Sequence, residues 1–309
     1  MSGLLNRPAS SRELSLAGDL SGLLVDLPTP FTGDLVPDLA AFRRLAGRAL
    51  AGGATGLLVL GATGEASALE EVERDVLLQV ALEAAEGHPV VAATGSCSTR
   101  QTIGWTRQAF QAGARAAVVV TPYFNQPTQA GLEAHFRAIA EAVPGFPLIV
   151  HNAPARTGVN LEPATLRNLW RVPEVSGILE SSGNLAQIGQ IARTLPDQKL
   201  LLAGDEGLAA ASIALGAKGL VSVLGSAFPP CLLDLVRLAL AGRQEEAGFL
   251  QEQLRPLTDA LLFESNPIPI KALLKSLGLC GSQVRLPLLP ASAGTRAILS
   301  VAVRRTKVA

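Results

Sequence analysis

The sequence has few of the residues that build metal centres, disulfide frameworks or aromatic binding surfaces. Its three cysteines, Cys97, Cys231 and Cys280, lie far apart and form no CxxC pair. This spacing argues against disulfides and zinc sites and fits a reducing cytoplasm. The three histidines form neither HxxxH nor HExxH, so we expect no metal ligand set. Aromatic residues make up 4% of the chain, too few for a surface that stacks nucleic-acid bases.

No charge of one sign dominates, and long hydrophobic runs are absent. Lys+Arg and Asp+Glu number 26 each, so no net field attracts nucleic acid or an anionic membrane. Apolar stretches end within about ten residues, well short of the ~20 that a spanning helix needs. We expect residues 1–18 to be an N-terminal extension without a signal peptide, a transit peptide being the alternative. A soluble, cytoplasmic protein with a large core is the expectation.

Apolar segments of strand length alternate with amphipathic segments of helix length along most of the chain. The strand segments are nearly continuous in Val, Leu, Ile and Ala, which is typical of strands covered on both faces. The predicted strands are Gly22–Leu27, Gly56–Leu60, Pro89–Ala93, Ala116–Thr121, Pro147–His151, Val175–Leu179, Lys199–Ala203 and Gly219–Val223. Among the predicted helices are Ala40–Leu50, Ala68–Glu86, Gln101–Ala112 and Leu132–Ala142, with Ser67, Ser98 and Thr128 as candidate N-caps.

Eight strands, each followed by a helix, predict an α/β fold, a (β/α)₈ TIM barrel, with a doubly wound open sheet as the alternative. We place the barrel at residues 19–228. Residues 229–309 are expected to hold the final barrel helix and a helical C-terminal region, because Pro229–Leu279 and Ala291–Val303 have helical patterns.

In such a barrel, functional groups lie where strands give way to loops. The turn Gly61–Glu65 offers backbone N–H groups, Gly64 among them, and the Thr63 hydroxyl to a small carboxylate. Arg156 has no acidic neighbour in sequence, so we interpret it as a fork for a second carboxylate.

Proton-transfer candidates follow the fifth and sixth predicted strands. His151 is a candidate acid–base residue, with a satisfied core histidine as the alternative. Glu180 and Glu65 suit either catalysis or helix capping. Tyr123 suits either ligand contact or packing.

Five motifs in order resemble the dihydrodipicolinate synthase / N-acetylneuraminate lyase family, on its dihydrodipicolinate synthase side. They are Gly61-Ala-Thr-Gly-Glu65, Thr121-Pro-Tyr-Phe-Asn125, Asn152-Ala-Pro-Ala-Arg-Thr-Gly158, Leu201-Leu-Ala-Gly-Asp205 and Asn266-Pro-Ile-Pro-Ile-Lys271. The resemblance covers about Gly22 to Pro287 and implies a homo-oligomer, usually a tetramer. It implies a class I aldolase that holds pyruvate as a Schiff base on a strand-six lysine, without a further cofactor. Its implied substrate contacts here are Thr63, Gly64, Tyr123, Arg156, Gly204 and Val221.

Four positions depart from this pattern. Leu179 occupies the lysine position in Gly177-Ile-Leu-Glu-Ser-Ser-Gly183, and an alkyl side chain cannot form an imine. His151 stands at the strand-five tyrosine, Phe124 at the tyrosine that reaches a neighbouring subunit's site, and Ala62 at the relay threonine.

The remaining lysines are poorly placed to substitute for the missing one. No lysine precedes Lys199, and both Lys199 and Lys218 open strands, at the barrel end opposite the site. Lys271 and Lys275 fall in the C-terminal helical region, and Lys307 in the tail.

We therefore predict a family member that has lost Schiff-base lyase activity and keeps a pocket for a small 2-oxo acid or other carboxylate. One alternative is an active lyase or aldolase on 2-oxo acids, with His151 and Glu180 as acid and base or a metal near Glu180, Asp205 and Glu206. The other is a structural or interaction protein with a vestigial pocket. Nucleic-acid and membrane partners are not expected.

Overall fold

The computed structural model describes residues 16–306, and eight parallel strands form its centre. They follow one another in chain order, and pairing of β1 with β8, Gly22 opposite Gly219, closes the barrel. The strands are β1 (Gly22–Asp26), β2 (Gly56–Val59), β3 (Val90–Ala93), β4 (Ala116–Val120), β5 (Leu148–Asn152), β6 (Val175–Glu180), β7 (Leu200–Ala203) and β8 (Gly219–Ser222). The predicted (β/α)₈ barrel is confirmed, and closure excludes the open sheet.

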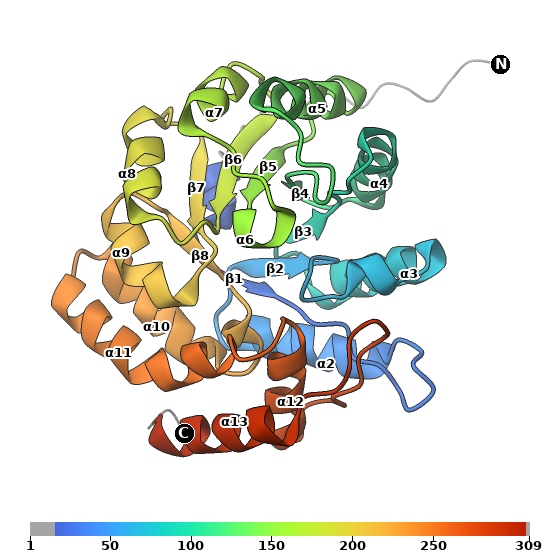
Figure 1. Cartoon of the computed structure of the whole chain (residues 1–309), viewed down its shortest axis with the longest axis vertical. Coiled ribbons are helices and arrows are strands. Elements are labelled where there is room, and N and C mark those ends of the chain that lie inside the picture. Colours follow the sequence, from blue (N-terminus) through green and yellow to red (C-terminus); the bar gives the residue numbers. More distant parts are fainter. Residues whose placement is uncertain (1–15, 307–309) are drawn as a thin grey trace.

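Helices surround the barrel, and the last ones lie together beside β1 and α2 (Figure 1). The helices of the barrel layer are α2 (Leu39–Ala51), α3 (Glu71–Ala84), α4 (Thr99–Ala112), α5 (Gln129–Ala142), α6 (Pro154–Thr157), α7 (Pro163–Leu169), α8 (Leu185–Thr194), α9 (Ala209–Ala214) and α10 (Pro229–Leu240). The C-terminal segment continues with α11 (Gln244–Ala260), α12 (Ile268–Ser276) and α13 (Ala293–Arg305). The expected helical C-terminal region is present as these separate helices.

Helix starts follow the capping rules at two of the three predicted positions. The Ser98 and Thr128 side chains accept hydrogen bonds from Gln101 N and Gly131 N, at the starts of α4 and α5. The prediction for Ser67 was wrong. Ser67 lies inside a short 3₁₀ turn, and α3 begins later, where Glu70 and Glu73 form a capping box.

Successive strand residues alternate between the barrel interior and the helix layer, as the two-residue period of a strand requires. The interior set is one apolar cluster, which includes Leu24, Leu58, Ile149, Leu179 and Leu202. Their strand neighbours belong to the larger core between sheet and helices, which includes Leu23, Leu57, Val150, Ile178 and Leu201. The interior is therefore packed below the level at which polar side chains begin.

A short helix, α1 (Leu16–Leu20), precedes the first strand. Leu16 and Leu20 are buried in the interior cluster with Leu24, so α1 covers the amino-terminal end of the barrel. The predicted boundary of the N-terminal extension at residue 18 falls inside this helix. The extension's residues 1–15, like Lys307, lie outside the described residues.

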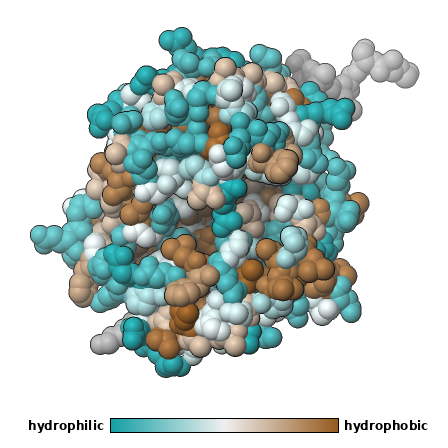
Figure 2. Space-filling model, viewed as in Figure 1, coloured by the Kyte–Doolittle hydropathy of each residue, from teal (hydrophilic) through white to brown (hydrophobic). Residues whose placement is uncertain are grey.

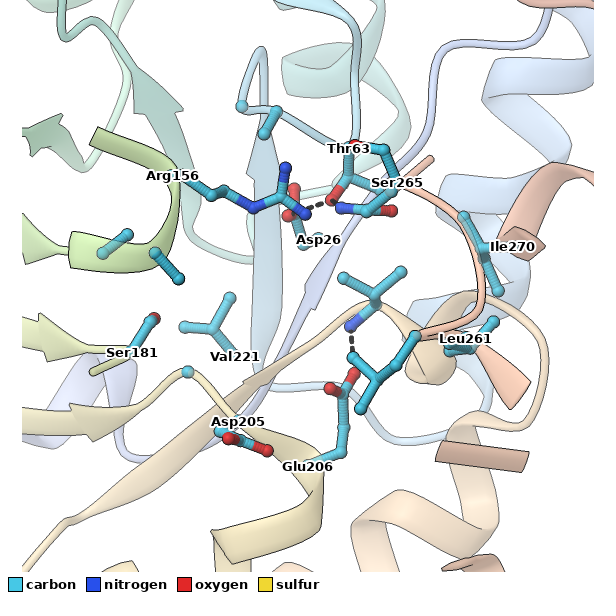
Figure 3. A pocket seen from close by; sticks show the side chains of 18 of the residues that line it. Asp26, Thr63, Arg156, Ser181, Asp205, Glu206, Val221, Leu261, Ser265 and Ile270 are labelled. Carbon is cyan, nitrogen blue, oxygen red and sulfur yellow. Dashed lines mark hydrogen bonds between the residues drawn. The ribbon is translucent and has the colours of Figure 1, made fainter. Parts of the chain in front are cut away.

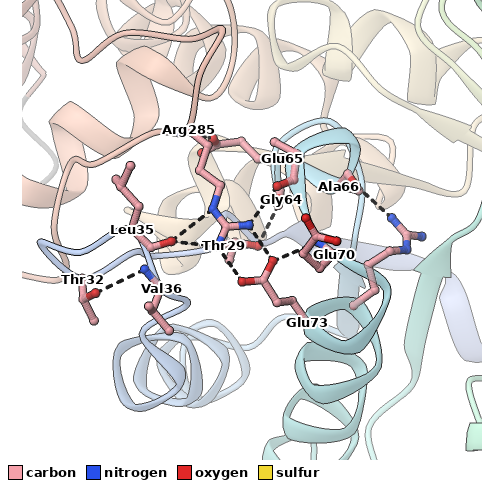
Figure 4. Close-up of polar contacts among 12 residues, drawn as sticks. Thr29, Thr32, Leu35, Val36, Gly64, Glu65, Ala66, Glu70, Glu73 and Arg285 are labelled. Atoms are coloured by element: carbon pink, nitrogen blue, oxygen red, sulfur yellow. Dashed lines mark hydrogen bonds and ion pairs between the residues drawn. The ribbon is translucent and has the colours of Figure 1, made fainter.

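The C-terminal segment is fastened to the turn after β2 by buried and half-buried charges. Lys271, fully buried, forms an ion pair with Glu65 and donates to the Gln283 carbonyl at 2.8 Å. Arg285 pairs with Glu73, and its backbone N–H donates to Glu65 Oε2 at 2.9 Å (Figure 4). These contacts hold the last quarter of the chain against the carboxyl-terminal end of the barrel.

Apolar side chains gather on the lower part of the face seen in Figure 2, over the C-terminal segments. Exposed large apolar residues in these segments include Leu262, Phe263, Leu286 and Leu289. Within residues 16–306, no helix is both long and apolar enough to cross a membrane.

Candidate active site

A cavity of about 610 Å³ opens at the carboxyl-terminal ends of the strands. Side chains from β1 to β6 and from β8 line it, together with the loop after β7, and the segment before α12 forms one wall (Figure 3). Among the residues that line the cavity are Asp26, Ala62, Thr63, His151, Arg156, Leu179, Ser181, Gly204, Glu206, Val221 and Asn266.

Strand alternation explains which polar groups reach this cavity. Asp26 follows the interior residue Leu24 by two positions, and Ser181 follows Leu179 in the same way. His151 continues the interior row of Ile149. Each polar residue is therefore the last inward-pointing position of its strand, above the apolar layers.

Asp26, Thr63 and Asn266 form one hydrogen-bonded chain at the cavity wall (Figure 3). Asn266 Nδ2 donates to Thr63 Oγ1 at 2.8 Å, and the Thr63 hydroxyl donates to Asp26 Oδ2. The other oxygen of each outer residue, Asp26 Oδ1 and Asn266 Oδ1, is buried without a hydrogen-bond partner among residues 16–306. The Thr63 hydroxyl was expected to donate to a ligand carboxylate, but it donates to Asp26 instead.

The carboxyl of Asp26 has an unusual affinity for its proton. Burial raises the pKa of Asp26 from 3.8 to about 7, and the nearby Glu206 adds to the rise, while the Thr63 hydrogen bond and Arg156 oppose it. Burial favours the neutral acid because water no longer solvates the charge. Asp26 therefore changes charge near neutral pH.

His151 lies beside Ser181, with its Nε2 3.1 Å from the Ser181 Oγ. Burial, together with the positive charge of Arg156, lowers the pKa of His151 to about 4. The imidazole is therefore neutral at pH 7, and its tautomer decides whether it donates to Ser181 or accepts from it. A neutral histidine beside a hydroxyl can accept or relay a proton.

Arg156 comes from the short helix α6 and extends toward Asp26 (Figure 3). In the described part of the chain, its guanidinium forms no ion pair and donates no side-chain hydrogen bond. Its five N–H donors face a cavity that contains Asp26 and Glu206 but no lysine of the described residues. The Arg156 guanidinium is thus available to donate two parallel hydrogen bonds to a ligand carboxylate.

The structure does not bring Glu180 together with His151. Glu180 is buried on the outward face of β6, where both carboxylate oxygens accept from Asn152 Nδ2 and Oε1 also accepts from Ser182 N at 2.9 Å. Gln187 Nε2 approaches Oε2 at 3.4 Å. Glu180 is absent from the described residues that line the cavity, because it alternates with Leu179 and Ser181. Burial raises its pKa despite these hydrogen bonds.

The other predicted residues divide into two groups. Ala62, Thr63, Gly204, Val221 and Leu179 line the cavity. Gly64, Tyr123 and Phe124 are not among the described lining residues. Gly64 supports the turn through its carbonyl, which accepts from Thr29 Oγ1 at 2.7 Å. Phe124 is 93% exposed, with φ of 72°.

The described lysines have structural partners or lie elsewhere. Lys199 donates to the backbone carbonyls of Val172, Pro173 and Val175, at the amino-terminal end of β6. The Lys218 carbonyl accepts from Gly22 N, at the amino-terminal end of β1. Lys271 is paired with Glu65, and Lys275 is exposed on α12.

The acidic residues after β7 accept hydrogen bonds from backbone N–H groups. Glu206 Oε1 accepts from Ser222 Oγ and from the N–H groups of Val223 and Leu224, and burial raises its pKa. Asp205 Oδ1 accepts from Gly207 N at 2.9 Å. Among residues 16–306, no group of three or more His, Cys, Asp or Glu side chains is placed to hold a metal ion.

Sequence reasoning missed Asp26, Ser181 and the role of Asn266. The first two carried a usable signal, since each stands two residues beyond an apolar interior position. Asn266 carried no local signal, because its contact with Thr63 joins positions 203 residues apart.

Comparison with known proteins gives one family. The model of the dihydrodipicolinate synthetase family matches residues 19–306. The 4-hydroxy-tetrahydrodipicolinate synthase of Thermomicrobium roseum is 42% identical over 285 residues, 92% of this chain and 94% of the relative. The enzyme of the same name from Xanthomonas axonopodis pv. citri is 43% identical over 275 residues, 89% and 90% of the two chains.

Solved structures agree with the sequence matches. Dihydrodipicolinate synthase from Thermotoga maritima superimposes with a TM-score of 0.91 at 33% identity, covering 94% of this chain and all of that one. The chloride-inhibited dihydrodipicolinate synthase from Acinetobacter baumannii, complexed with pyruvate, gives 0.91 at 34% identity with the same coverage.

Proposed function

Because this chain belongs to the dihydrodipicolinate synthetase family, we propose that it binds a small carboxylate, 2-oxo acids included, reversibly and without Schiff-base catalysis. One observation carries the proposal. Leu179, 2% exposed, stands in the cavity at the position where the family resemblance implies a lysine, and no described lysine lines that cavity. A ketone bound there meets no primary amine of residues 16–306 with which to form an imine.

Arg156 supports ligand binding at this site. Its guanidinium faces the cavity with its donors open, and a carboxylate can accept two parallel hydrogen bonds from such a fork. Gly204 leaves room for the Ser181 side chain in the same cavity, since a Cβ at position 204 would stand 2.0 Å from Ser181 Oγ. Val221 and Leu179 supply the apolar floor.

Reduction with borohydride in the presence of pyruvate tests the proposal. An imine, once reduced, remains on the protein as a fixed mass increase in the intact-mass spectrum. We expect none, and a stable adduct mapped to any lysine would overturn the absence of Schiff-base chemistry. Calorimetric titration with pyruvate and oxaloacetate, repeated on Arg156→Ala, measures reversible binding. If no carboxylate gives a heat of binding, the remaining interpretation is an interaction protein with a vestigial pocket.

The variant Leu179→Lys is the matched gain-of-function test. Leu179 belongs to the interior cluster and lines the cavity, so a lysine there enters a desolvated site that favours the neutral amine. We expect borohydride to trap pyruvate on this variant only. Lack of trapping would mean that the pocket no longer presents a ketone to this position.

A second candidate function is proton transfer on the bound ligand by His151. The observation in its favour is the 3.1 Å contact between His151 Nε2 and Ser181 Oγ in the cavity. In this case Glu180 acts as a positioning residue, since it holds Asn152 beside His151 in β5. Turnover of 4-hydroxy-2-oxo acids that is lost in His151→Ala and kept in His135→Gln would favour this function. His135 is the control because it is bound to Thr99 outside the cavity.

Self-association is the remaining part of the proposal. Phe124 projects from the loop after β4 with 93% exposure, and aromatic residues are enriched at the interfaces between protein chains. The family resemblance implies that this position contacts a neighbouring subunit. We propose a homo-oligomer, a tetramer or a dimer, in the cytoplasm.

A further inference from the structure

Two hydrogen-bond acceptors in the cavity wall lack donors. Asp26 Oδ1 and Asn266 Oδ1 are buried and have no partner in the described part of the chain, and their two residues bind the same Thr63 hydroxyl. A buried unsatisfied oxygen costs roughly 1–3 kcal/mol, and more when it is charged. Both residues line the cavity, so a ligand is placed to supply the missing donors.

Thr63 cannot satisfy these oxygens itself. Its hydroxyl proton is donated to Asp26 Oδ2, and its oxygen already accepts from Asn266 Nδ2. When Asp26 is ionised, above about pH 7, the Asp26–Thr63 pair therefore offers an acceptor and no free donor of its own. Glu206 is near enough to Asp26 to raise its proton affinity, which makes the region still less favourable for a ligand anion.

Arg156 brings a positive charge and hydrogen-bond donors to the same cavity. It is the cation that interacts with both Asp26 and His151, and Figure 3 shows it extending toward Asp26. The cavity thus has a carboxylate receptor close to a pair of hydrogen-bond acceptors, as the α-carboxylate and 2-substituent of a small acid require. A keto oxygen placed at the acceptors would leave them unpaired, whereas an ammonium or hydroxyl group would satisfy them.

Resting on the carboxylate-binding function proposed above, we propose that this site selects 2-amino or 2-hydroxy acids over the corresponding 2-oxo acids. The ligand carboxylate pairs with Arg156, and its hydrogen-bond donor binds Asp26 Oδ1 and Asn266 Oδ1. An ammonium group and a hydroxyl group can both donate hydrogen bonds to these oxygens. They differ in charge, because only an ammonium also neutralises the Asp26 carboxylate.

Isothermal titration at pH 8 with matched ligands tests the proposal on the full-length protein. One set is alanine, lactate and pyruvate, and a longer set is glutamate, 2-hydroxyglutarate and 2-oxoglutarate, each chiral ligand in both enantiomers. We expect the donor-bearing ligands of at least one set to bind roughly tenfold or more tightly than the 2-oxo acid, as a buried charge-assisted hydrogen bond implies. Tighter binding of amino acids than of hydroxy acids identifies an ammonium; equal or reversed affinity identifies a hydroxyl.

The variant Asp26→Asn assigns the preference to its cause. The amide keeps the shape of the side chain and an oxygen for Thr63, but it removes the charge and turns an acceptor into a donor. We expect the donor preference to fall to within about threefold, with 2-oxo acid binding unchanged or tighter. Glu174→Gln, at the amino-terminal end of the barrel near Gly145, is the control and keeps the wild-type preference.

The two proposals fail in different ways. If 2-oxo acids bind reversibly and as tightly as their amino and hydroxy counterparts, the donor selectivity is refuted and the carboxylate site stands. If Arg156→Ala binds every ligand like the wild type, or if pyruvate becomes covalently attached, the carboxylate-binding function itself is refuted. A preference retained in Asp26→Asn would assign the donor site to other residues and overturn the role given to Asp26.

Discussion

At the scale of single residues, one carboxyl determines how the site responds to pH. Asp26 stands where β1 ends, faces the cavity, and keeps its proton up to about pH 7 because burial disfavours its charge. Its neighbours Thr63 and Arg156 lower its pKa by less than burial raises it. The residue therefore links charge to stability and, in the proposal above, to ligand selectivity.

Replacing Asp26 by Asn should stabilise the protein at pH 8. The folded-state pKa of about 7 lies above the ordinary value of 3.8, so the folded protein binds more protons than the unfolded chain in that interval. The wild type thus loses stability as the pH rises from about 4 through about 7. Asn escapes this loss, and we expect its advantage in unfolding free energy to reach on the order of 2–4 kcal/mol above pH 7.

Urea unfolding at pH 4, 6 and 8 measures this difference. The gap between variant and wild type should widen with pH and then remain constant above about pH 7. A gap that is the same at all three pH values would contradict a carboxyl that ionises on this scale.

Residue roles were only partly predictable from the sequence. Arg156 and His151 were identified from their positions at the ends of apolar strands, and Leu179 from the family resemblance; all three line the cavity. Glu180 was grouped with His151, although it alternates with Leu179 along β6. It therefore faces the helix layer and not the cavity. Asp26 was overlooked, although counting two residues on from Leu24 would have placed it inside.

At the scale of elements, helix starts give a direct comparison of two hydroxyl residues. Thr128 caps α5 by accepting from Gly131 N, whereas Ser67 lies in a 3₁₀ turn and caps no helix. Thr128→Ala should lower the free energy of unfolding by about 1 kcal/mol, and Ser67→Ala by no more than a few tenths. Thermal or urea unfolding of both variants checks the contrast, and equal losses would mean that Thr128 is not an effective cap.

The attachment of α12 to the turn after β2 should depend on a single buried cation. Lys271→Met leaves the Glu65 carboxylate buried without its ammonium partner, so we expect a loss of about 3–5 kcal/mol in unfolding free energy. Lys275→Met, on the exposed side of the same helix, is the matched control and should be nearly neutral. Chemical denaturation distinguishes the two, and similar small losses would show that Glu65 finds other partners.

Element positions were predicted well because each strand of a parallel barrel is a continuous apolar run bounded by polar residues. The predicted Gly219–Val223 differs from β8 by one residue, and Ala116–Thr121 from β4 by one. The start of α3 was missed because a 3₁₀ turn separates Ser67 from the helix, and the capping box at Glu70 carries the signal instead.

At the scale of the whole molecule, an exposed phenylalanine marks the surface where copies of the chain are proposed to meet. Phe124→Asp places a charge at a position that is 93% exposed in the single chain, so it should leave the fold intact and weaken association. Light scattering with size-exclusion chromatography should show a smaller mass at equal concentration, with unchanged circular dichroism. An unchanged mass would exclude Phe124 from the interface, and the exposed Phe249 of α11 provides a comparison variant.

The hydrogen bond between Asn266 and Thr63 spans 203 residues, and this has a consequence for biosynthesis. A ribosome that has delivered all eight strands has not yet delivered the wall that Asn266 and Ile270 contribute. Under the proposed function, ligand binding therefore requires a chain synthesised at least as far as Ile270. A translation product truncated before Asn266 would lack this wall, so binding of a small molecule would distinguish finished chains from unfinished ones.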